Sequence, residues 1–212
     1  MAMRPSTSIP PARRTSDEAG NSLGSLRETA AHCRDCPLWK DATQTVFGAG
    51  RSAARIVLVG EQPGNQEDLT GKPFVGPAGL LLDRALDEAG VDRKATYVTN
   101  AVKHFKFELR GKRRLHKKPN ELEIAACHQW LEREVEVIDP ALIVALGATA
   151  ARAVFGRTTG IDKNRGRILN LKEAGARGLT HKADVLVTST LLSCCACRRK
   201  TRMPRSSASW PT

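Results

Sequence analysis

The hydrophobic positions of this chain follow two alternating patterns, short continuous apolar runs and longer stretches with helical spacing. The apolar runs predict buried strands over Ile56 to Val59, Ala95 to Thr99, Ala141 to Leu146 and Asp184 to Val187. Helical spacing predicts helices over Ala78 to Ala89, Glu121 to Val137 and Ala148 to Val154. This alternation favours an α/β fold, a single domain in which a parallel four-stranded sheet is covered by helices on both faces.

Composition agrees with one globular domain. The 212 residues are 41% hydrophobic and 4% aromatic, enough to bury one core. No apolar run approaches the ~20 residues of a membrane span, and the start lacks the apolar centre of a signal peptide, so we expect a cytoplasmic protein that does not bind membranes. We expect residues 1–25, rich in Ser, Pro, Ala and Arg, to be a disordered leader. The folded domain is expected to span residues 26–188.

The glycine-rich loop after the first apolar run carries candidate chemistry. It places Glu61, Gln62, Asp68 and Phe74 among glycines and prolines between Gly60 and Gly79. Ligands bind at the carboxyl ends of parallel strands, so this loop and those after Asn100 and Val187 should share one crevice. An aromatic face with amide groups suits a flat polar ring such as a nucleic-acid base. The alternative is an ordinary strand-to-helix turn.

The net charge of +12 is concentrated in one segment. From Lys103 to Lys118 the chain has eight Lys or Arg residues and a single acid, Glu108. A solvated surface usually interleaves both signs, whereas a one-signed segment gains free energy by releasing counterions from DNA or RNA. This segment therefore predicts a loop that binds nucleic acid.

Four residues outside the glycine-rich loop are candidate metal ligands. Cys33 and Cys36 form a Cys-x-x-Cys pair, and His104 and Cys127 follow later in the chain. A structural disulfide is not expected in the cytoplasm, which leaves zinc, an iron–sulfur cluster or a redox dithiol. His104 taken alone also fits an ordinary histidine.

Several motifs together resemble one enzyme family. They are Gly60 to Gly64, Lys72 to Gly79, Val98 to Lys103 and the Lys-Arg-Arg-Leu-His run of Lys112 to His116. This combination resembles the uracil-DNA glycosylases of the iron–sulfur group, and the last run resembles their covalently trapping branch, UdgX. The resemblance covers roughly residues 28 to 188. It implies the α/β/α fold of these glycosylases, activity on uracil in single- or double-stranded DNA, and a monomer.

The resemblance also implies a cofactor and site residues. It implies a [4Fe-4S] cluster held by Cys33, Cys36 and Cys127, with His104 where the hydrolytic relatives have a fourth Cys; zinc stays the alternative. Uracil would stack on Phe74 and bond to Asn100, and backbone N–H groups around Gln62 and Gly64 would stabilise the leaving base. Glu61 would orient or activate the attacking group. The DNA backbone would be contacted by Lys112, Arg113, Arg114 and Lys117.

His116 decides between functions within the family. Resemblance to the covalent branch places its neutral imidazole at the sugar C1′, so that excision leaves the protein joined to the abasic site. A phosphate contact by His116 is the alternative role. The alternative functions are an ordinary hydrolytic uracil-DNA glycosylase and a non-catalytic DNA-binding iron–sulfur module.

The tail, residues 189–212, departs from the family pattern. It has five basic residues, no acid, no helical spacing and the cysteines Cys194, Cys195 and Cys197. A back-translation with GC-rich codons, read one base earlier, gives Val-His-Pro-Ser followed by an amphipathic stretch, which is how the relatives end. We therefore expect a one-base deletion near Thr188 that impairs the protein. A second metal site at the three cysteines is the alternative.

Overall fold

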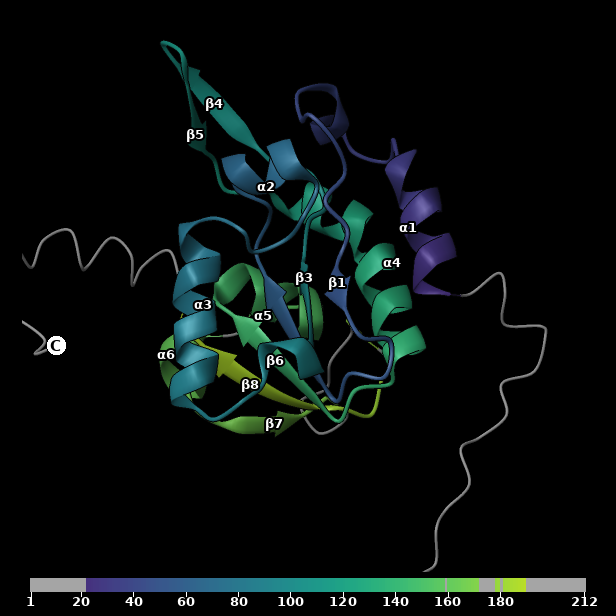
Figure 1. The fold of residues 1–212 in the computed structure, drawn as a ribbon, viewed down its shortest axis with the longest axis vertical. Coiled ribbons are helices and arrows are strands. Elements are labelled where there is room, and N and C mark those ends of the chain that lie inside the picture. Colours follow the sequence, from purple (N-terminus) through teal and green to yellow (C-terminus); the bar gives the residue numbers. More distant parts are fainter. Residues whose placement is uncertain (1–21, 159, 172–177, 180, 190–212) are drawn as a thin grey trace, which may run out of the picture.

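The computed structural model describes residues 22–158, 160–171, 178–179 and 181–189, and its centre is a six-stranded sheet (Figure 1). The strand order is β1-β3-β2-β6-β8-β7. The strands are β1 (Ala49–Gly50), β2 (Ile56–Gly60), β3 (Thr96–Asn100), β6 (Leu142–Leu146), β7 (Ile168–Asn170) and β8 (Asp184–Thr188). The inner strands β3, β2, β6 and β8 are parallel, and the outer strands β1 and β7 pair antiparallel with β3 and β8.

The predicted parallel four-stranded sheet is therefore the inner part of a larger, mixed sheet. The four inner strands coincide with the four apolar runs, within one residue at each end. The prediction was wrong about the number of strands and about a purely parallel sheet. The two edge strands have only two and three residues, too few to produce a periodic pattern in the sequence.

Helices cover the sheet on both faces, as predicted. They are α1 (Leu23–Ala31), α2 (Asn65–Thr70), α3 (Pro77–Glu88), α4 (Glu121–Ile138), α5 (Ala148–Phe155) and α6 (Ile161–Asn164), with the 3-10 turns η2 (Pro37–Lys40) and η3 (Arg93–Ala95). In Figure 1, α3 lies on one side of the sheet, and α4 with α1 beyond it lies on the other. None of the helices in the described ranges is both long and apolar enough to cross a membrane.

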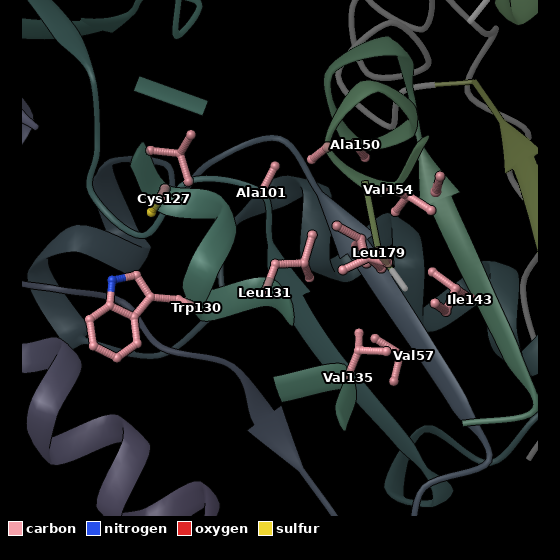
Figure 2. Close-up of a cluster of buried hydrophobic side chains, with 14 of the residues drawn as sticks. Val57, Ala101, Cys127, Trp130, Leu131, Val135, Ile143, Ala150, Val154 and Leu179 are labelled. Carbon is pink, nitrogen blue, oxygen red and sulfur yellow. The ribbon is translucent and has the colours of Figure 1, made fainter. Parts of the chain in front are cut away.

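Alternate residues of the inner strands point into two separate cores. Val57 and Val59 of β2 pack with α1, α4 and α5, whereas Leu58 packs with Leu82 and Leu86 of α3. Figure 2 shows the larger core, where Leu131 and other α4 side chains lie against β2 and β6. Because strands buried on both faces carry apolar residues at most positions, apolar runs identified them, although β3 also has buried Thr96, Thr99 and Asn100.

The basic segment forms a hairpin, whereas the sequence predicted a loop. Strands β4 (Phe107–Arg110) and β5 (Arg113–His116) pair antiparallel and project from the body of the molecule beside α2 (Figure 1). We call residues 107–116 the basic hairpin. Its first strand alternates apolar and polar residues, but this run has only four residues and lies in a segment that was interpreted from its charge. Its last residue, His116, is opposite Phe107.

The ends of the chain lie largely outside the described residues. The expected leader ends within α1, because Ser22 caps this helix by accepting the Ser25 N–H at 3.2 Å and the helix begins at Leu23. Residues 1–21 and 190–212, including the three tail cysteines, lie outside the described residues.

Candidate active site

Functional side chains gather at one edge of the sheet, where three parallel strands end. Glu61 and Gln62 follow β2, Asn100 ends β3, and Thr149 lies in the first turn of α5 directly after β6. Ligands of open α/β sheets bind in the crevice at this edge. The loops after Gly60 and Asn100 therefore meet, as predicted, and Thr149 joins them from a third strand. The third predicted loop, after Val187, lies beyond Ser189 outside the described residues.

Gly60 allows an aromatic ring and an amide to meet at the end of β2. A Cβ atom there would collide with Asn100 Oδ1 and would lie 2.7 Å from Phe74 Cζ, so only glycine leaves room for both side chains. Phe74 itself has φ 56°, a left-handed conformation that costs a non-glycine residue about 1–2 kcal/mol. Backbone strain of this kind clusters at ligand sites. Phe74 and Asn100 thus form one wall of the crevice.

Glu61 lies between two side chains from distant parts of the chain. Its Oε1 is 3.3 Å from His116 Nε2 of the basic hairpin, and its Oε2 accepts the Thr149 hydroxyl at 2.5 Å. The side chains of His116 and Glu61 are 31% and 20% exposed, so both remain accessible from solvent. A carboxylate held by a hydroxyl on one oxygen and facing an imidazole on the other can orient that ring and stabilise positive charge on it.

Gln62 fastens the basic hairpin to the crevice. Its amide nitrogen donates to the carbonyls of Lys106 and Lys117 at 3.0 and 3.1 Å, and its amide oxygen accepts the Lys106 N–H at 3.2 Å. Lys106 and Lys117 flank the two strands of the hairpin. The side chain of Gln62 is thus fully engaged with backbone groups of the hairpin.

Glu67 links two distant points of the glycine-rich loop by hydrogen bonds to glycine N–H groups. Its carboxylate accepts a hydrogen bond from the N–H of Gly64, the N-cap of α2, at 3.1 Å. It also accepts one from the N–H of Gly76, the residue before α3, at 2.7 Å. The Gly64 N–H, predicted to face the leaving base, therefore has a partner within the protein. Because Glu67 is buried, it joins the two halves of the loop that carries Phe74.

Arg114 makes a second attachment between the basic hairpin and the body. Its guanidinium donates to Asp68 Oδ2 at 2.6 Å and to Asn65 Oδ1 at 2.7 Å, and it lies over the rings of Phe105 and Phe107. Asp68 is fully buried, so this pair is shielded from solvent. Arg114, predicted to contact DNA, is thus already paired within the protein.

The positive charge of the basic segment divides into internal and exposed groups. Lys103 pairs with Glu134, Lys106 with Glu123, and Arg114 with Asp68. The exposed group has no acidic partner among the described residues and consists of Arg110, Lys112, Arg113, Lys117 and Lys118. Three of the predicted DNA contacts, Lys112, Arg113 and Lys117, are therefore free to bind phosphate.

A buried network of hydrogen bonds holds the backbone of Asn100 in place. Lys103 Nζ donates to the Asn100 carbonyl at 2.9 Å and to Glu134 Oε2 at 2.6 Å. Glu134 also accepts from Tyr97, Thr99 and the N–H of Gly48. Burial, with the Glu134 charge as a second cause, raises the pKa of Tyr97 well above its usual value, so the phenol stays protonated as a donor. We call Gly48, Tyr97, Thr99, Lys103 and Glu134 the Asn100 support network.

The three candidate ligand cysteines lie in one region behind the crevice. Cys36 and Cys127 belong to the larger core, and Cys33 packs against it. Burial raises the pKa of Cys127 to about 12. The Cys127 sulfur accepts the Lys103 N–H at 3.2 Å, and the Cys33 sulfur accepts the Trp130 indole N–H at 3.3 Å. Within the described ranges, no three His, Cys, Asp or Glu side chains gather tightly enough for a single metal ion.

The hydrogen bonds around His104 indicate which of its ring nitrogens carries the proton. Its Nε2 lies 2.9 Å from the Thr45 hydroxyl, which in turn donates to the Ala30 carbonyl at 3.2 Å. Since a hydroxyl has one proton, Thr45 must accept from His104 Nε2–H. The other nitrogen, Nδ1, then carries a lone pair, which is the form that ligates a metal. Burial lowers the pKa of His104, which keeps the ring neutral.

Comparison with known proteins identifies the family to which this chain belongs. A family model described as the uracil DNA glycosylase superfamily matches residues 47–205, most of the chain. The chain belongs to the uracil DNA glycosylase superfamily. The match begins ahead of β2 and includes every crevice residue described above. It also runs past Thr188, where we expected the sequence to depart from the family.

Relatives in this superfamily come from several organisms. A type-4 uracil-DNA glycosylase of Thermotoga maritima is 43% identical over 142 residues, which are 66% of this chain and 70% of that protein. A type-4 uracil-DNA glycosylase of Archaeoglobus fulgidus is 36% identical over 78% of this chain and 83% of its own length. A type-5 uracil-DNA glycosylase of Pyrobaculum aerophilum is 32% identical over 73% of this chain and 72% of its own.

Sequence analysis missed several residues of this glycosylase-like crevice. Thr149 was not considered, although it comes three residues after a predicted strand, the rule that had identified Glu61. The side-chain role of Gln62 left no sequence signal, because its partners are backbone groups more than 40 residues away. Glu134 looked like one of several acids on an amphipathic helix.

Proposed function

We propose that this protein excises uracil from DNA and becomes covalently linked to the abasic site through His116. One observation carries the proposal: a histidine on a basic hairpin faces Glu61 at 3.3 Å, beside the wall formed by Phe74 and Asn100. A neutral imidazole in this position can attack a sugar carbon, and Glu61 can stabilise the imidazolium that forms.

Each wall of the crevice has a part in the proposed reaction. Phe74 stacks on the flipped uracil, and the side-chain amide of Asn100 hydrogen-bonds to the polar edge of the base. Among the described residues, none hydrogen-bonds to this side-chain amide, so it is available to the base. The hydrogen bonds of the Gln62 side chain to the hairpin hold this residue in place. Its backbone N–H stabilises the negative charge that develops on the base. Gly64 contributes by shaping the loop, with its own N–H held by Glu67.

The bond changes balance within this set of groups. The N-glycosidic bond breaks and its electron pair leaves on uracil, while an imidazole nitrogen of His116 forms a bond to C1′. The ring becomes an imidazolium, whose charge Glu61 stabilises until its proton passes to the uracil anion or to solvent. Neutral uracil leaves, and a neutral imidazole remains bonded to the sugar.

A uracil-containing oligonucleotide tests this proposal. Wild-type protein should release uracil and give a protein–DNA band that survives SDS, on single- and double-stranded substrates. His116→Ala should lose the band, and His128→Ala, a histidine on α4 away from the crevice, should keep it. A band that persists in His116→Ala would exclude His116 as the nucleophile.

The similarity to type-4 glycosylases favours a second function. In an ordinary hydrolytic glycosylase, Glu61 would activate water, and His116 would contact a phosphate. That protein would release uracil over many turnovers without an SDS-resistant band. A non-catalytic DNA-binding module would instead shift uracil and thymine strands alike and release no base.

We also propose that Cys33, Cys36, Cys127 and His104 hold a [4Fe-4S] cluster. Support comes from the placement of the three cysteines in or against one core cluster and from the N–H groups that donate to two of the sulfurs. The lone pair of His104 Nδ1 adds a fourth possible ligand. When bound, the cluster would link α4 to the segment before β1. Cys127→Ala should lose iron and stability together, whereas the triple change of Cys194, Cys195 and Cys197 to Ala should keep both. A stable, iron-free wild type would contradict the cluster.

For the tail we propose a one-base deletion in the gene near Thr188. The support is that one choice of GC-rich codons for the tail, read in the neighbouring frame, gives Val-His-Pro-Ser and an amphipathic stretch. Restoring that frame should raise solubility and the rate of adduct formation. Independent sequencing reads with an intact frame, or equal rates and melting temperatures for the two forms, would end this proposal.

A further inference from the structure

Lys103 is almost completely buried, and no other Lys or Arg among the described residues is. Its partner Glu134 is fully buried as well. Replacing a buried ion pair by apolar side chains of similar volume is often neutral or stabilising, so such a pair is weak evidence for a role in stability. Stability alone therefore does not explain why an ammonium group lies behind the crevice.

Helix α4 holds Lys103 at two points. Cys127 and Glu134 lie about two turns apart on α4 and so share one face of the helix. The Cys127 sulfur accepts the Lys103 N–H at 3.2 Å, and Glu134 Oε2 accepts from Lys103 Nζ at 2.6 Å. The Lys103 carbonyl accepts the Val46 N–H at 2.8 Å. Both the main chain and the ammonium group of Lys103 are thus fixed relative to α4.

The ammonium group binds the end of β3, where pairing with β1 has stopped. Strand β1 pairs with β3 at Tyr97 and Val98, whereas β3 continues to Asn100. Lys103 Nζ donates to the Asn100 carbonyl at 2.9 Å. The ammonium group thus supplies a donor at a strand end that β1 does not reach.

The placement of the Asn100 backbone decides where the side-chain amide lies. Asn100 is 4% exposed, and its Oδ1 lies so close to Gly60 that a Cβ atom there would collide with it. No hydrogen bond from a described residue orients this amide, so its position follows from the backbone that carries it. Uracil presents a donor at N3 and an acceptor at O4, and cytosine presents the reverse. An amide that reads this edge must therefore be placed accurately.

We propose that Lys103 is a positioning residue for base recognition. It holds Asn100 where the side-chain amide selects uracil over cytosine, and Glu134 keeps the ammonium group directed at the Asn100 carbonyl. This inference rests on the proposed binding of uracil by Asn100. The fold itself does not require the ion pair, provided that both charges are removed together.

The double change Lys103→Met with Glu134→Gln removes the ammonium group without leaving a buried charge. Gln keeps the shape of Glu134 and still accepts from the Gly48 N–H and the Tyr97 hydroxyl. The denaturation midpoint should therefore stay near that of wild type, whereas Glu134→Gln alone should lower it.

Thr99→Val is the matched control. It removes a hydroxyl that bonds to both Lys103 and Glu134, but it leaves the bond from Lys103 to the Asn100 carbonyl. A loss that came from general loosening of the buried network would appear in this variant too.

The first measurement is the affinity for a single strand with one 2′-fluoro-deoxyuridine, relative to the same strand with 2′-fluoro-deoxycytidine. The fluorine slows departure of the base, so binding is measured without cleavage. Wild type should prefer the uracil strand, and the double variant should lose about tenfold of this preference while binding the cytosine strand as before. Thr99→Val should keep the preference. An unchanged preference in the folded double variant, or an equal loss in Thr99→Val, would overturn the role of Lys103.

The second measurement needs no DNA and follows hydrogen exchange at Ala101 and Val102, whose N–H groups donate to carbonyls at the end of β2 at 2.9 and 3.0 Å. In the double variant, exchange at these two residues should be about tenfold faster, while β6 should exchange as in wild type. Unchanged exchange, or a double variant that does not fold, would overturn the proposal. A wild type without preference for uracil would instead overturn the proposed function, and hydrogen exchange would still decide whether Lys103 holds Asn100.

Discussion

Two parts of the crevice are held in place by opposite means. The wall at Asn100 rests on the Asn100 support network, in which Glu134 and Lys103 are almost completely buried and bonded to several partners each. The basic hairpin has little core of its own and is attached mainly through the side chains of Gln62 and Arg114. The wall at Asn100 is thus continuous with the core, whereas His116, the residue proposed to attack the sugar, lies on the projecting hairpin.

This difference predicts that stability and adduct formation respond to different residues. A change in the Asn100 support network removes partners from buried charges and should destabilise the whole fold. A change in an attachment of the hairpin leaves the core intact but lets His116 move relative to Glu61. Since reacting groups must be placed within about 1 Å, chemistry should be affected before stability.

The largest effect is expected from Glu134→Gln. It leaves the Lys103 ammonium buried without a charged partner, and breaking such a pair costs about 3–5 kcal/mol. Denaturant unfolding of the variant should show this loss. Glu136→Gln, an exposed acid on the same helix, should change the free energy of unfolding by less than about 0.5 kcal/mol. Similar midpoints for the two variants would show that the network does not support the fold.

Gln62→Met tests the hairpin attachment. The change keeps the side-chain length but removes three hydrogen bonds to the backbone at Lys106 and Lys117. Adduct formation should fall by about 10²-fold through misplacement of His116, with a much smaller change in the free energy of unfolding. Gln66→Met, the same change at an exposed position of α2, serves as the control. If stability and adduct rate fell in proportion, the hairpin would be part of the core and the comparison would fail.

The same contrast explains what could be predicted from the sequence. The four inner strands were recognisable because burial on both faces favours apolar residues at most positions. Glu61 and Asn100 stood out as polar residues at strand ends, and Phe74 as an aromatic residue in the glycine-rich loop. The basic hairpin was not predicted as strands, because each strand has only four residues and the segment was interpreted from its charge. Its attachments to Gln62 and Asp68 come from distant parts of the chain. Side-chain to backbone bonds across 40 or more residues leave no local signal.

The exposed charge of the hairpin is tested by Lys112→Ala combined with Arg113→Ala. If both contact phosphates, DNA binding should weaken by about tenfold at moderate salt, and the slope of log K against log salt should fall by about 2. The loss should be the same for uracil and thymine strands. Arg51→Ala with Arg55→Ala removes two exposed charges before β2, at the opposite end of the sheet, and should leave the slope unchanged.

Thr149→Val gives the smallest expected effect and the finest test of the comparison. Thr149 is a buried residue at the start of α5, in the body of the protein. Its hydroxyl nevertheless donates to Glu61, which faces His116 of the basic hairpin. Valine keeps the shape and removes the donor to Glu61 Oε2, while Oε1 still faces His116. Because Glu61 is partly exposed, water replaces part of the lost bond, so a net contribution of about 1 kcal/mol predicts a loss of about fivefold in adduct rate. Thr149→Ser keeps the hydroxyl and should recover the rate. If Thr149→Ser were as slow as Thr149→Val, packing at the start of α5, not the orientation of Glu61, would be what Thr149 provides.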